Sequence, residues 1–296
     1  MYTSFTFSRS LKVEPIIGVE VRVVWNKFVF FNDGKGGTYA AYTIGSNNKG
    51  PGGYFGDQMT NKRGQFLFSL WDGDRKEKSK KSTYGKQKIT KSSRLAWPLN
   101  IDRCKRNCQD CGIPGMEGVK KEGLSTGTQC KIQYPKYTDG HGYTIKLMRT
   151  EKRKTINTAD YGGMPKAHEA IGETDREVTG SVWKMIAINY DSKQEFEVGE
   201  ILLEGATALD RLKSFDEMLG CRKCEDVYHK DTRYGPKITY EDGTEETPKS
   251  VSGLTKKGKC KEYSISGSKE DSSIIFESGP GTEKRWRKLG KKVTIW

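Results

Sequence analysis

Seven cysteines are the residues of this sequence whose spacing most directly indicates chemistry. Cys104, Cys108 and Cys111 lie in one short segment, and Cys221 and Cys224 form a CxxC pair. Three thiolates with CxxxCxxC spacing can ligate three irons of a four-iron, four-sulfur cluster. Radical chemistry on such a cluster needs an alternating strand–helix barrel, and the sequence shows no such alternation, so we do not assign a cluster.

The same cysteines fit a zinc site or a set of disulfides. Cys221 and Cys224 could complete a four-thiolate zinc site with two of the upstream thiols. Residues 1–12 contain no apolar signal-peptide segment, so the chain is interpreted as a mature form behind an added Met1 or as a cytosolic protein. Composition and cysteine grouping favour a secreted, extracellular protein, in which disulfides are expected. The predicted disulfide cysteines are Cys104, Cys108, Cys111, Cys130, Cys221 and Cys224, and the predicted odd thiol is Cys260.

Carboxylates supply a second possible chemistry. Asp57, Asp72 and Asp74 lie near aromatic residues, and a glycosidase needs two carboxylates that face one cleft. Facing cannot be established from sequence, so no catalytic residue is assigned. A turn, or a structural calcium ion, is the simpler explanation of Asp72 and Asp74, and Asn32 and Asp33 are similar calcium candidates. No cofactor is therefore expected, and a structural calcium ion is the alternative that these residues leave open.

Aromatic rings beside glycine-rich and polar loops are suited to stacking on sugar faces. The alternative is that Phe55 and Trp71 only fill the core side of two strands. We predict a ligand-binding set made of Tyr54, Phe55, Asp57, Gln58, Trp71 and Trp97.

A basic surface is the next feature. Lys+Arg total 52 and Asp+Glu total 38, so the formal net charge is +14 at pH 7. Most basic residues are lysines, which attract anions diffusely and are poorer than arginine at bidentate recognition of phosphates and bases. Simple solubility is the alternative explanation. We expect binding to anionic polysaccharide or to a mineral surface, with the contacting lysines in the polar stretch 75–94: Lys76, Lys78, Lys80 and Lys81.

The elements that must position these residues are predicted to be mostly strands. Residues 19–25, 27–31, 38–44, 54–59 and 65–71 show strand patterns separated by glycine-rich turns, and 126–134, 141–147, 182–188 and 197–203 follow. One helix is predicted at about 206–219, because Leu209, Leu212, Phe215 and Leu219 have helical spacing before Gly220. The expected fold is mainly β: an antiparallel β-sandwich or jelly roll with this helix and long loops. Residues 1–165 and 166–296 form two halves, or one continuous domain.

Three segments carry a resemblance to a known family. They are GGYFGDQ at 52–58, FSLWD at 68–72 and EGLSTGTQC at 122–130. Over about residues 20–225 the chain resembles the secreted domain-of-unknown-function 3472 family. The resemblance implies an extracellular β-sandwich, often found beside carbohydrate-binding modules and without an established activity. The turn before Cys130 is longer than the family pattern, and the lysine-rich stretch 75–94 departs from it.

These features predict an extracellular structural or matrix-type protein whose basic surface binds anionic polysaccharide or a silica-like mineral phase. Self-assembly into a homo-oligomer or filament is an added expectation, because exposed sheet edges and an odd cysteine can join chains. A glycan-active enzyme with loop carboxylates is the alternative, and a non-specific nucleic-acid binder is a weaker one. No membrane span is expected, because no run of eighteen apolar residues occurs.

Overall fold

The computed structural model describes residues 1–30, 37–47, 51–60, 63–72, 94–108, 126–134, 140–164, 169, 172–219, 227–254, 263–279 and 292–296. Every element with assigned bounds in these ranges is a strand, apart from the 3-10 turn η2 (Thr158–Tyr161). The strands are β1 (Tyr2–Thr6), β2 (Ile16–Phe30), β3 (Gly37–Ser46), β4 (Gly52–Thr60), β5 (Gly64–Trp71), β6 (Ala96–Pro98), β7 (Cys104–Cys108), β8 (Thr126–Tyr134), β9 (Gly142–Asn157), β10 (Glu177–Asn189), β11 (Glu195–Glu204), β12 (Leu209–Leu219), β13 (Val227–Tyr240), β14 (Glu245–Glu246), β15 (Ser250–Leu254), β16 (Tyr263–Ser268), β17 (Ser273–Ser278) and β18 (Lys292–Thr294).

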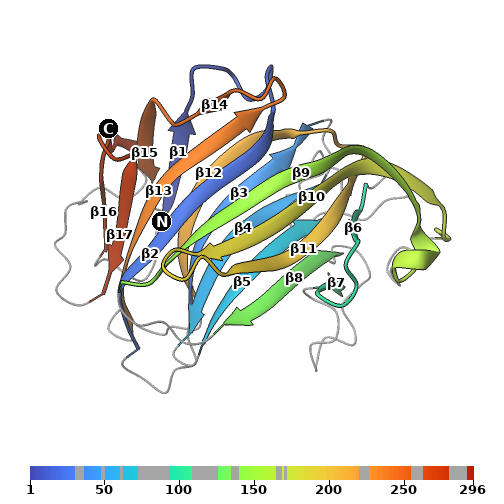
Figure 1. The fold of residues 1–296 in the computed structure, drawn as a ribbon, viewed down its shortest axis with the longest axis horizontal. Helices are drawn as coiled ribbons and strands as arrows, with labels where there is room; N and C mark the ends of the chain where they lie inside the picture. The colour runs from blue at the N-terminus through green and yellow to red at the C-terminus, as the bar shows by residue number, and fades with distance from the viewer. Residues whose placement is uncertain are drawn as a thin grey trace.

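The strands pair antiparallel throughout and fall into two runs of neighbours (Figure 1). The first run has the order β7-β8-β5-β4-β3-β12-β1-β15-β18. The second has the order β6-β11-β10-β9-β2-β13-β17-β16, and β14 also pairs with β13. A single pair, Leu209 with Ile16, joins β12 to β2 and so connects the two runs. The predicted mainly-β, antiparallel fold is confirmed.

The hydrophobic core lies between the two runs. Tyr42, Phe55 and Phe68 enter it from the first run, and Val21 and Trp183 enter it from the second. All five side chains are buried because strand residues alternate between the two faces, so that every second side chain points inward. Each run therefore has an inner face on this core and an outer face.

The predicted strands 19–25 and 27–31 belong to one strand, β2, whose described bounds are Ile16–Phe30. The register with β13 shifts at this point, since Lys27 pairs with Lys230 while Trp25 pairs with Asp231. Asn26 is the extra residue of a β-bulge. The bulge interrupts the alternation in the sequence without ending the strand.

The predicted helix at 206–219 is wrong, because Leu209–Leu219 form strand β12. Leu212 is buried, whereas Arg211 and Lys213 are exposed, which is the two-residue period of a strand. The inward positions after Leu212 carry polar residues, so the sequence lacks the apolar alternation that would have indicated a strand. No helix within the described ranges is long and apolar enough to cross a membrane.

Candidate functional site

Cross-strand register places a set of polar and aromatic side chains on the outer face of the first run. Directly paired residues of antiparallel strands project from the same face, so their register defines rows across the sheet. One row contains Glu217, Tyr39, Gln58, Gln65 and Gln133. The next contains Tyr2, Phe215, Ala41, Gly56, Leu67 and Lys131. A third contains Lys213, Thr43, Tyr54, Ser69, Gln129 and Lys105. A fourth contains Arg211, Gly45, Gly52, Trp71 and Gly127. We call these four rows the amide–aromatic face.

Tyr54 is at the centre of the aromatic contacts on this face. Its ring centroid lies 6.0 Å from that of Phe215, 6.4 Å from that of Trp71 and 6.5 Å from that of Tyr39. The rings of Tyr39, Tyr54 and Trp71 are half-buried, so each keeps some exposed surface. Partly exposed rings with a polar edge are suited to a wet binding surface.

The second row forms a low apolar strip between two polar rows. Ala41, Gly56 and Leu67 are buried there although they lie on the outer face. A Cβ atom on Gly56 would lie 2.5 Å from the Ala40 carbonyl oxygen and 2.8 Å from Ala41 Cβ. Close packing of β4 against β3 therefore requires glycine at this position.

Side-chain amides on both sides of the strip supply hydrogen-bonding groups. Gln129 Nε2 donates to the Tyr54 hydroxyl at 3.4 Å, and Gln65 donates to Gln58. Burial raises the pKa of both Tyr54 and Tyr39, so both hydroxyls are protonated at neutral pH. Neutral hydroxyls and amides can each donate and accept a hydrogen bond, as sugar hydroxyls do.

Basic side chains stand at both ends of the rows. Arg211 and Lys213 project from β12 at one end, and Lys105 and Lys131 project from β7 and β8 at the other. All four are exposed, and none of them forms an ion pair in the part of the chain that the structure describes. Although Lys131 is exposed, desolvation by the surrounding protein atoms lowers the pKa of its ammonium group, so an anionic ligand nearby would favour its charged form.

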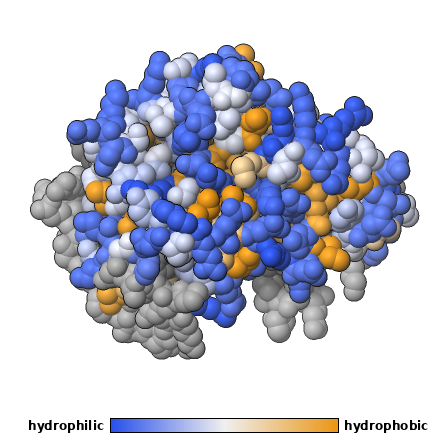
Figure 2. Space-filling model, viewed as in Figure 1, coloured by the Kyte–Doolittle hydropathy of each residue, from blue (hydrophilic) through white to orange (hydrophobic). Residues whose placement is uncertain are grey.

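The outer face of the second run has a different electrostatic organisation. Lys146 pairs with Glu20 at 2.8 Å, and Lys184 pairs with Glu197 at 2.6 Å. Hydrophilic side chains dominate this side of the molecule, with hydrophobic groups among them (Figure 2). These basic side chains form ion pairs within the protein, whereas the four basic side chains of the amide–aromatic face form none in the described ranges.

The predicted ligand-binding residues divide between this face and the interior. Tyr54, Gln58 and Trp71 lie together on the amide–aromatic face. Phe55 and Asp57 project to the other side of β4 and are fully buried. The Asp57 carboxylate accepts hydrogen bonds from Trp25 Nε1 at 2.9 Å and from the Tyr134 hydroxyl. Asp57 therefore stabilises the core rather than contacting a ligand.

Trp97 lies in a separate, second core cluster and is fully buried. It packs among apolar residues that include Ile156, Val182 and Leu202. The Arg106 guanidinium lies 5.2 Å from the Trp97 ring centroid. Trp97 is thus separate from the rows that contain Tyr54 and Trp71.

Asp72 is engaged by protein donors on both carboxylate oxygens. Arg106 Nη1 donates to Oδ1 at 2.8 Å, Arg106 Nη2 donates to Oδ2, and the Ala96 backbone N–H donates to Oδ1 at 2.9 Å. This arrangement favours a structural ion pair over calcium coordination. The other predicted calcium ligands, Asn32, Asp33 and Asp74, lie outside the described residues, as do Lys76, Lys78, Lys80 and Lys81.

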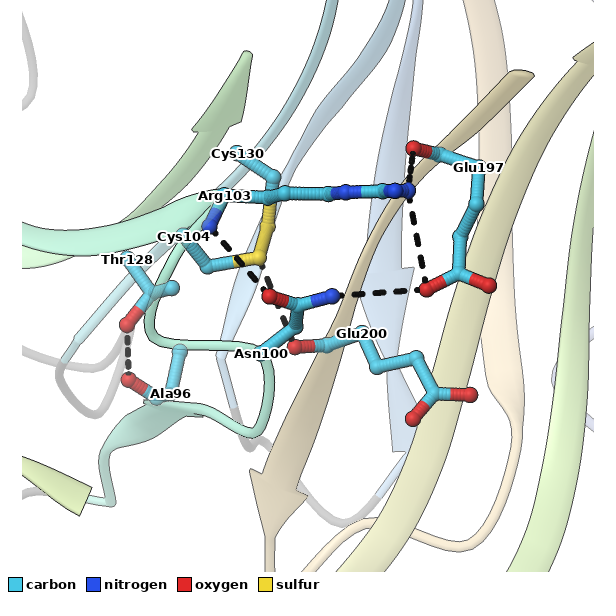
Figure 3. Close-up of a disulfide and its surroundings, with 8 residues drawn as sticks. All are labelled: Ala96, Asn100, Arg103, Cys104, Thr128, Cys130, Glu197 and Glu200. Atoms are coloured by element: carbon cyan, nitrogen blue, oxygen red, sulfur yellow. Dashed lines mark hydrogen bonds and ion pairs between the residues drawn. A yellow bond between two sulfur atoms is a disulfide. The ribbon is translucent and has the colours of Figure 1, made fainter. Parts of the chain in front are cut away.

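Two of the predicted disulfide cysteines, Cys104 and Cys130, form a disulfide between paired positions of β7 and β8 (Figure 3). Arg103 and Asn100, which precede β7, hydrogen-bond to Glu197 of β11, and the disulfide sulfur of Cys104 lies 3.6 Å from the Glu200 carbonyl oxygen. The disulfide therefore lies where an edge of the first run meets an edge of the second. The thiol of Cys108 and the residues Cys111, Cys221, Cys224 and Cys260 lie outside the described part of the chain.

A charged cluster that the sequence did not predict is buried in the core between β12 and β13. His229 Nε2 lies 2.6 Å from Asp216 Oδ2, and His229 Nδ1 lies 2.7 Å from Ser278 Oγ. Arg233 Nε donates to Asp231 Oδ2 at 2.7 Å. The only signal in the sequence is the His-x-Asp-x-Arg alternation at 229–233, which places all three on one face of a strand.

The cluster resembles a metal site in composition, since Asp216, His229 and Asp231 offer ligand atoms within 4.8 Å of one another. Charge balance argues against a divalent ion. With His229 protonated, the charges of His229 and Arg233 balance those of the Asp216 and Asp231 carboxylates. A divalent ion bound to neutral His229 would instead add two positive charges to that of Arg233, and the two carboxylates would leave a net positive charge buried. We interpret the cluster as a buried ion-pair network.

Burial alone would lower the pKa of His229, but the adjacent Asp216 carboxylate outweighs it and the pKa is raised. Burial would likewise raise the pKa of Asp216, yet His229 and Arg233 bring it down to about 2. Both directions describe a charged imidazolium–carboxylate pair.

Comparison with known proteins assigns no family to this chain. No family model matches it, and no curated protein matches it. Among solved structures, it is similar to a Scytalido-glutamic peptidase in complex with a peptide-based transition-state analogue, with a TM-score of 0.43 and 6% sequence identity. That alignment covers 94% of this chain and 96% of the other. At this level of similarity no activity follows, and the resemblance to the domain-of-unknown-function 3472 family stays a prediction.

Proposed function

We propose that the protein is an extracellular, matrix-type binding protein that holds anionic polysaccharide on its amide–aromatic face. The proposal includes the finer architecture: the two runs are the two sheets of a β-sandwich with jelly-roll character, and the amide–aromatic face is the outer surface of one sheet. The Cys104–Cys130 disulfide supports an oxidising compartment.

One observation carries the proposal: sugar-stacking rings, amides and basic groups without an ion-pair partner in the described ranges occupy the same face. Tyr54 and Trp71 supply rings, Gln58 supplies a side-chain amide, and Lys105 and Lys213 supply charge. Aromatic rings and amides recognise the apolar faces and hydroxyls of sugars, while ammonium groups attract carboxylates and sulfates. A mineral surface would use the charge but would not need the rings and amides.

The enzyme alternative requires two carboxylates facing one substrate. In the rows as the structure describes them, Glu217 is the only carboxylate, because Asp57 points into the core and Asp72 pairs with Arg106. A binding function therefore has more support than glycoside hydrolysis.

The test measures binding of polygalacturonate and heparin by titration calorimetry at low salt. The unmodified protein should bind, and Tyr54→Ala with Trp71→Ala should weaken binding about tenfold, equivalent to roughly 1.4 kcal/mol. Tyr190→Ala is the matched control, because Tyr190 is 45% exposed and stacks with Arg22 elsewhere on the molecule.

Three outcomes would overturn the proposal. They are no binding to either polysaccharide at low salt, an equal loss in the Tyr190 control, and equal binding of single-stranded DNA with matched charge density. Release of shortened sugar chains during the titration would instead support the enzyme alternative.

A further inference from the structure

The third row of the amide–aromatic face has a lysine at each end. It runs across six adjacent strands from Lys213 on β12 to Lys105 on β7. Between these ends lie Tyr54 and Gln129, joined by a hydrogen bond of 3.4 Å. A ligand lying along this row therefore meets charge first, then a neutral ring and amide, then charge again.

Each end has a second basic group in a neighbouring row. Arg211 lies two residues before Lys213 on β12, and Lys131 lies on β8 next to the strand that carries Lys105. None of the four has an ion-pair partner among the described residues, and the carboxylate of this face, Glu217, lies in the first row. Two basic ends are thus separated by an uncharged centre.

Strand spacing sets the distance between the ends. Neighbouring strands lie about 4.8 Å apart, so five spacings separate Lys213 and Lys105 by roughly 24 Å along the sheet. A pyranose unit of an extended chain is about as long as one strand spacing, so about five or six sugars bridge the two ends. A chain of three sugars reaches the centre and one end only.

We infer that this face selects anionic polysaccharide by length, binding one extended chain across the strands with both basic ends engaged at once. This inference rests on the proposed function and specifies the orientation of the chain and its smallest tight-binding length. A ligand that reaches both ends gains the second contact as an intramolecular event, which raises its affinity without any new kind of interaction.

The experiment compares oligogalacturonates of three and six sugars on four proteins. The unmodified protein should bind the six-sugar chain at least tenfold more tightly than the three-sugar chain. Two variants remove one end each: Arg211→Gln with Lys213→Gln, and Lys105→Gln with Lys131→Gln. Either variant should bind the two oligosaccharides with affinities within about threefold of each other.

The fourth protein is a charge-matched control, Lys146→Gln with Lys184→Gln. These lysines lie on the opposite face and are already paired with Glu20 and Glu197. The control loses the same net charge, so it should keep the tenfold preference for the longer chain. Circular dichroism of each variant confirms that the strands are retained before titration.

The outcomes separate the inference from the proposed function. If polygalacturonate binds and requires Tyr54, but both oligosaccharides bind the unmodified protein equally, the length inference is overturned and the function stands. If the control loses the preference as well, attraction is diffuse and the inference is also overturned. If neither polymer nor oligosaccharide binds the unmodified protein, the proposed function itself fails.

Discussion

At the scale of single residues, Gly56 and Gly199 lie at positions where the strands pack too closely for a side chain. Gly56 lets β4 approach β3 under the amide–aromatic face, and Gly199 lets β11 approach the disulfide. A Cβ atom on Gly199 would lie 2.4 Å from Cys104 Sγ and 2.7 Å from Cys130 Sγ. Both contacts are shorter than real Cβ atoms tolerate, so something must shift to accommodate a side chain.

Gly199→Ala should therefore destabilise the protein by about 1–3 kcal/mol, through overpacking against the disulfide. Urea unfolding measures the change. Gly253→Ala is the matched control, because the Cβ atom of an alanine there would lie an ordinary 3.4 Å from its nearest neighbour, Ile265 Cδ1. Equal stabilities of the two variants would contradict the packing argument.

The buried His229 predicts a pH dependence of stability. Its pKa is raised in the folded protein by Asp216 and Asp231 against burial and the Arg233 charge, and the Met1 amino group hydrogen-bonds the Asp216 carbonyl at 2.7 Å. A raised pKa stabilises the fold below the unfolded value of about 6.5, and this contribution is lost as pH rises through the folded pKa.

Asp216 predicts a loss of stability at acidic pH. Its pKa of about 2 lies below the usual value of 3.8, so its contribution is present above pH 3.8 and is lost as pH falls toward 2. The free energy of unfolding should therefore be greatest between about pH 4 and 6.5. His229→Gln should remove the decline above that window, as followed by urea unfolding across pH. An unchanged pH profile in this variant would exclude His229 as its origin.

At the scale of elements, strands β12 and β13 face each other across the core through charge rather than through apolar contact. Ser214 and Asp216 point inward from β12, while His229, Asp231 and Arg233 point inward from β13. Arg233 Nη1 donates to the Phe215 carbonyl oxygen at 2.8 Å, which fastens one strand to the other.

This charged interior explains what the sequence could not predict. Apolar alternation identifies β3, β4, β5 and β10, because their inward positions carry Tyr42, Phe55, Phe68 and Met185. In β12 after Leu212, and in β13 from His229 to Arg233, the inward positions are polar, so the leucine spacing of β12 indicates a helix and this part of β13 has the pattern of a polar loop. Burial of paired charges is a tertiary property, and neither propensity nor periodicity reveals it.

The candidate site was predictable only in part for a related reason. Tyr54, Gln58 and Trp71 lie on two consecutive strands, so local sequence was sufficient to group them. Glu217 and Lys213 reach the same face from β12, which pairs with β3 across more than 160 residues of sequence. Which of these residues share a row depends on register between distant strands, and register is fixed by the whole fold.

The buried ion pairs between β12 and β13 predict the effect of Asp216→Asn. The substitution removes one carboxylate while the charges of His229 and Arg233 stay buried, and breaking a buried ion pair in this way costs about 3–5 kcal/mol. Glu245→Gln is the control, since Glu245 pairs with Lys237 at 3.0 Å on the surface and should cost less than about 1 kcal/mol. Equal losses in urea unfolding would show that the buried network contributes no more than a surface pair.

At the scale of the whole molecule, the two outer faces differ in whether their basic side chains form ion pairs. On the outer face of the second run, Lys146 and Lys184 form ion pairs with Glu20 and Glu197, while lysines with no ion-pair partner among the described residues border the amide–aromatic face. The described basic side chains of the two faces therefore differ in their availability to ligands. Anions should collect on the face where the rings and amides lie.

The disulfide holds that face in shape, because Cys104 and Cys130 stand at the edge where the two runs meet. The two cysteines are separated by 26 positions, and a cross-link of this loop length stabilises a fold by about 3 kcal/mol in the chain-entropy model. Cys104→Ser with Cys130→Ser should lower the free energy of unfolding by about that amount.

The loss should also be local in hydrogen exchange. Amides of β7 and of the neighbouring β6 should exchange faster in the double variant, since the disulfide no longer ties β7 to β8 where these strands lie against β11. Amides of β2 and β13 should keep their protection, because twelve register pairs join these strands away from that edge. Uniformly faster exchange would show global destabilisation without local opening. Unchanged exchange in β6 and β7 would show that the hydrogen bonds of Arg103 and Asn100 to Glu197 are sufficient to join the two edges.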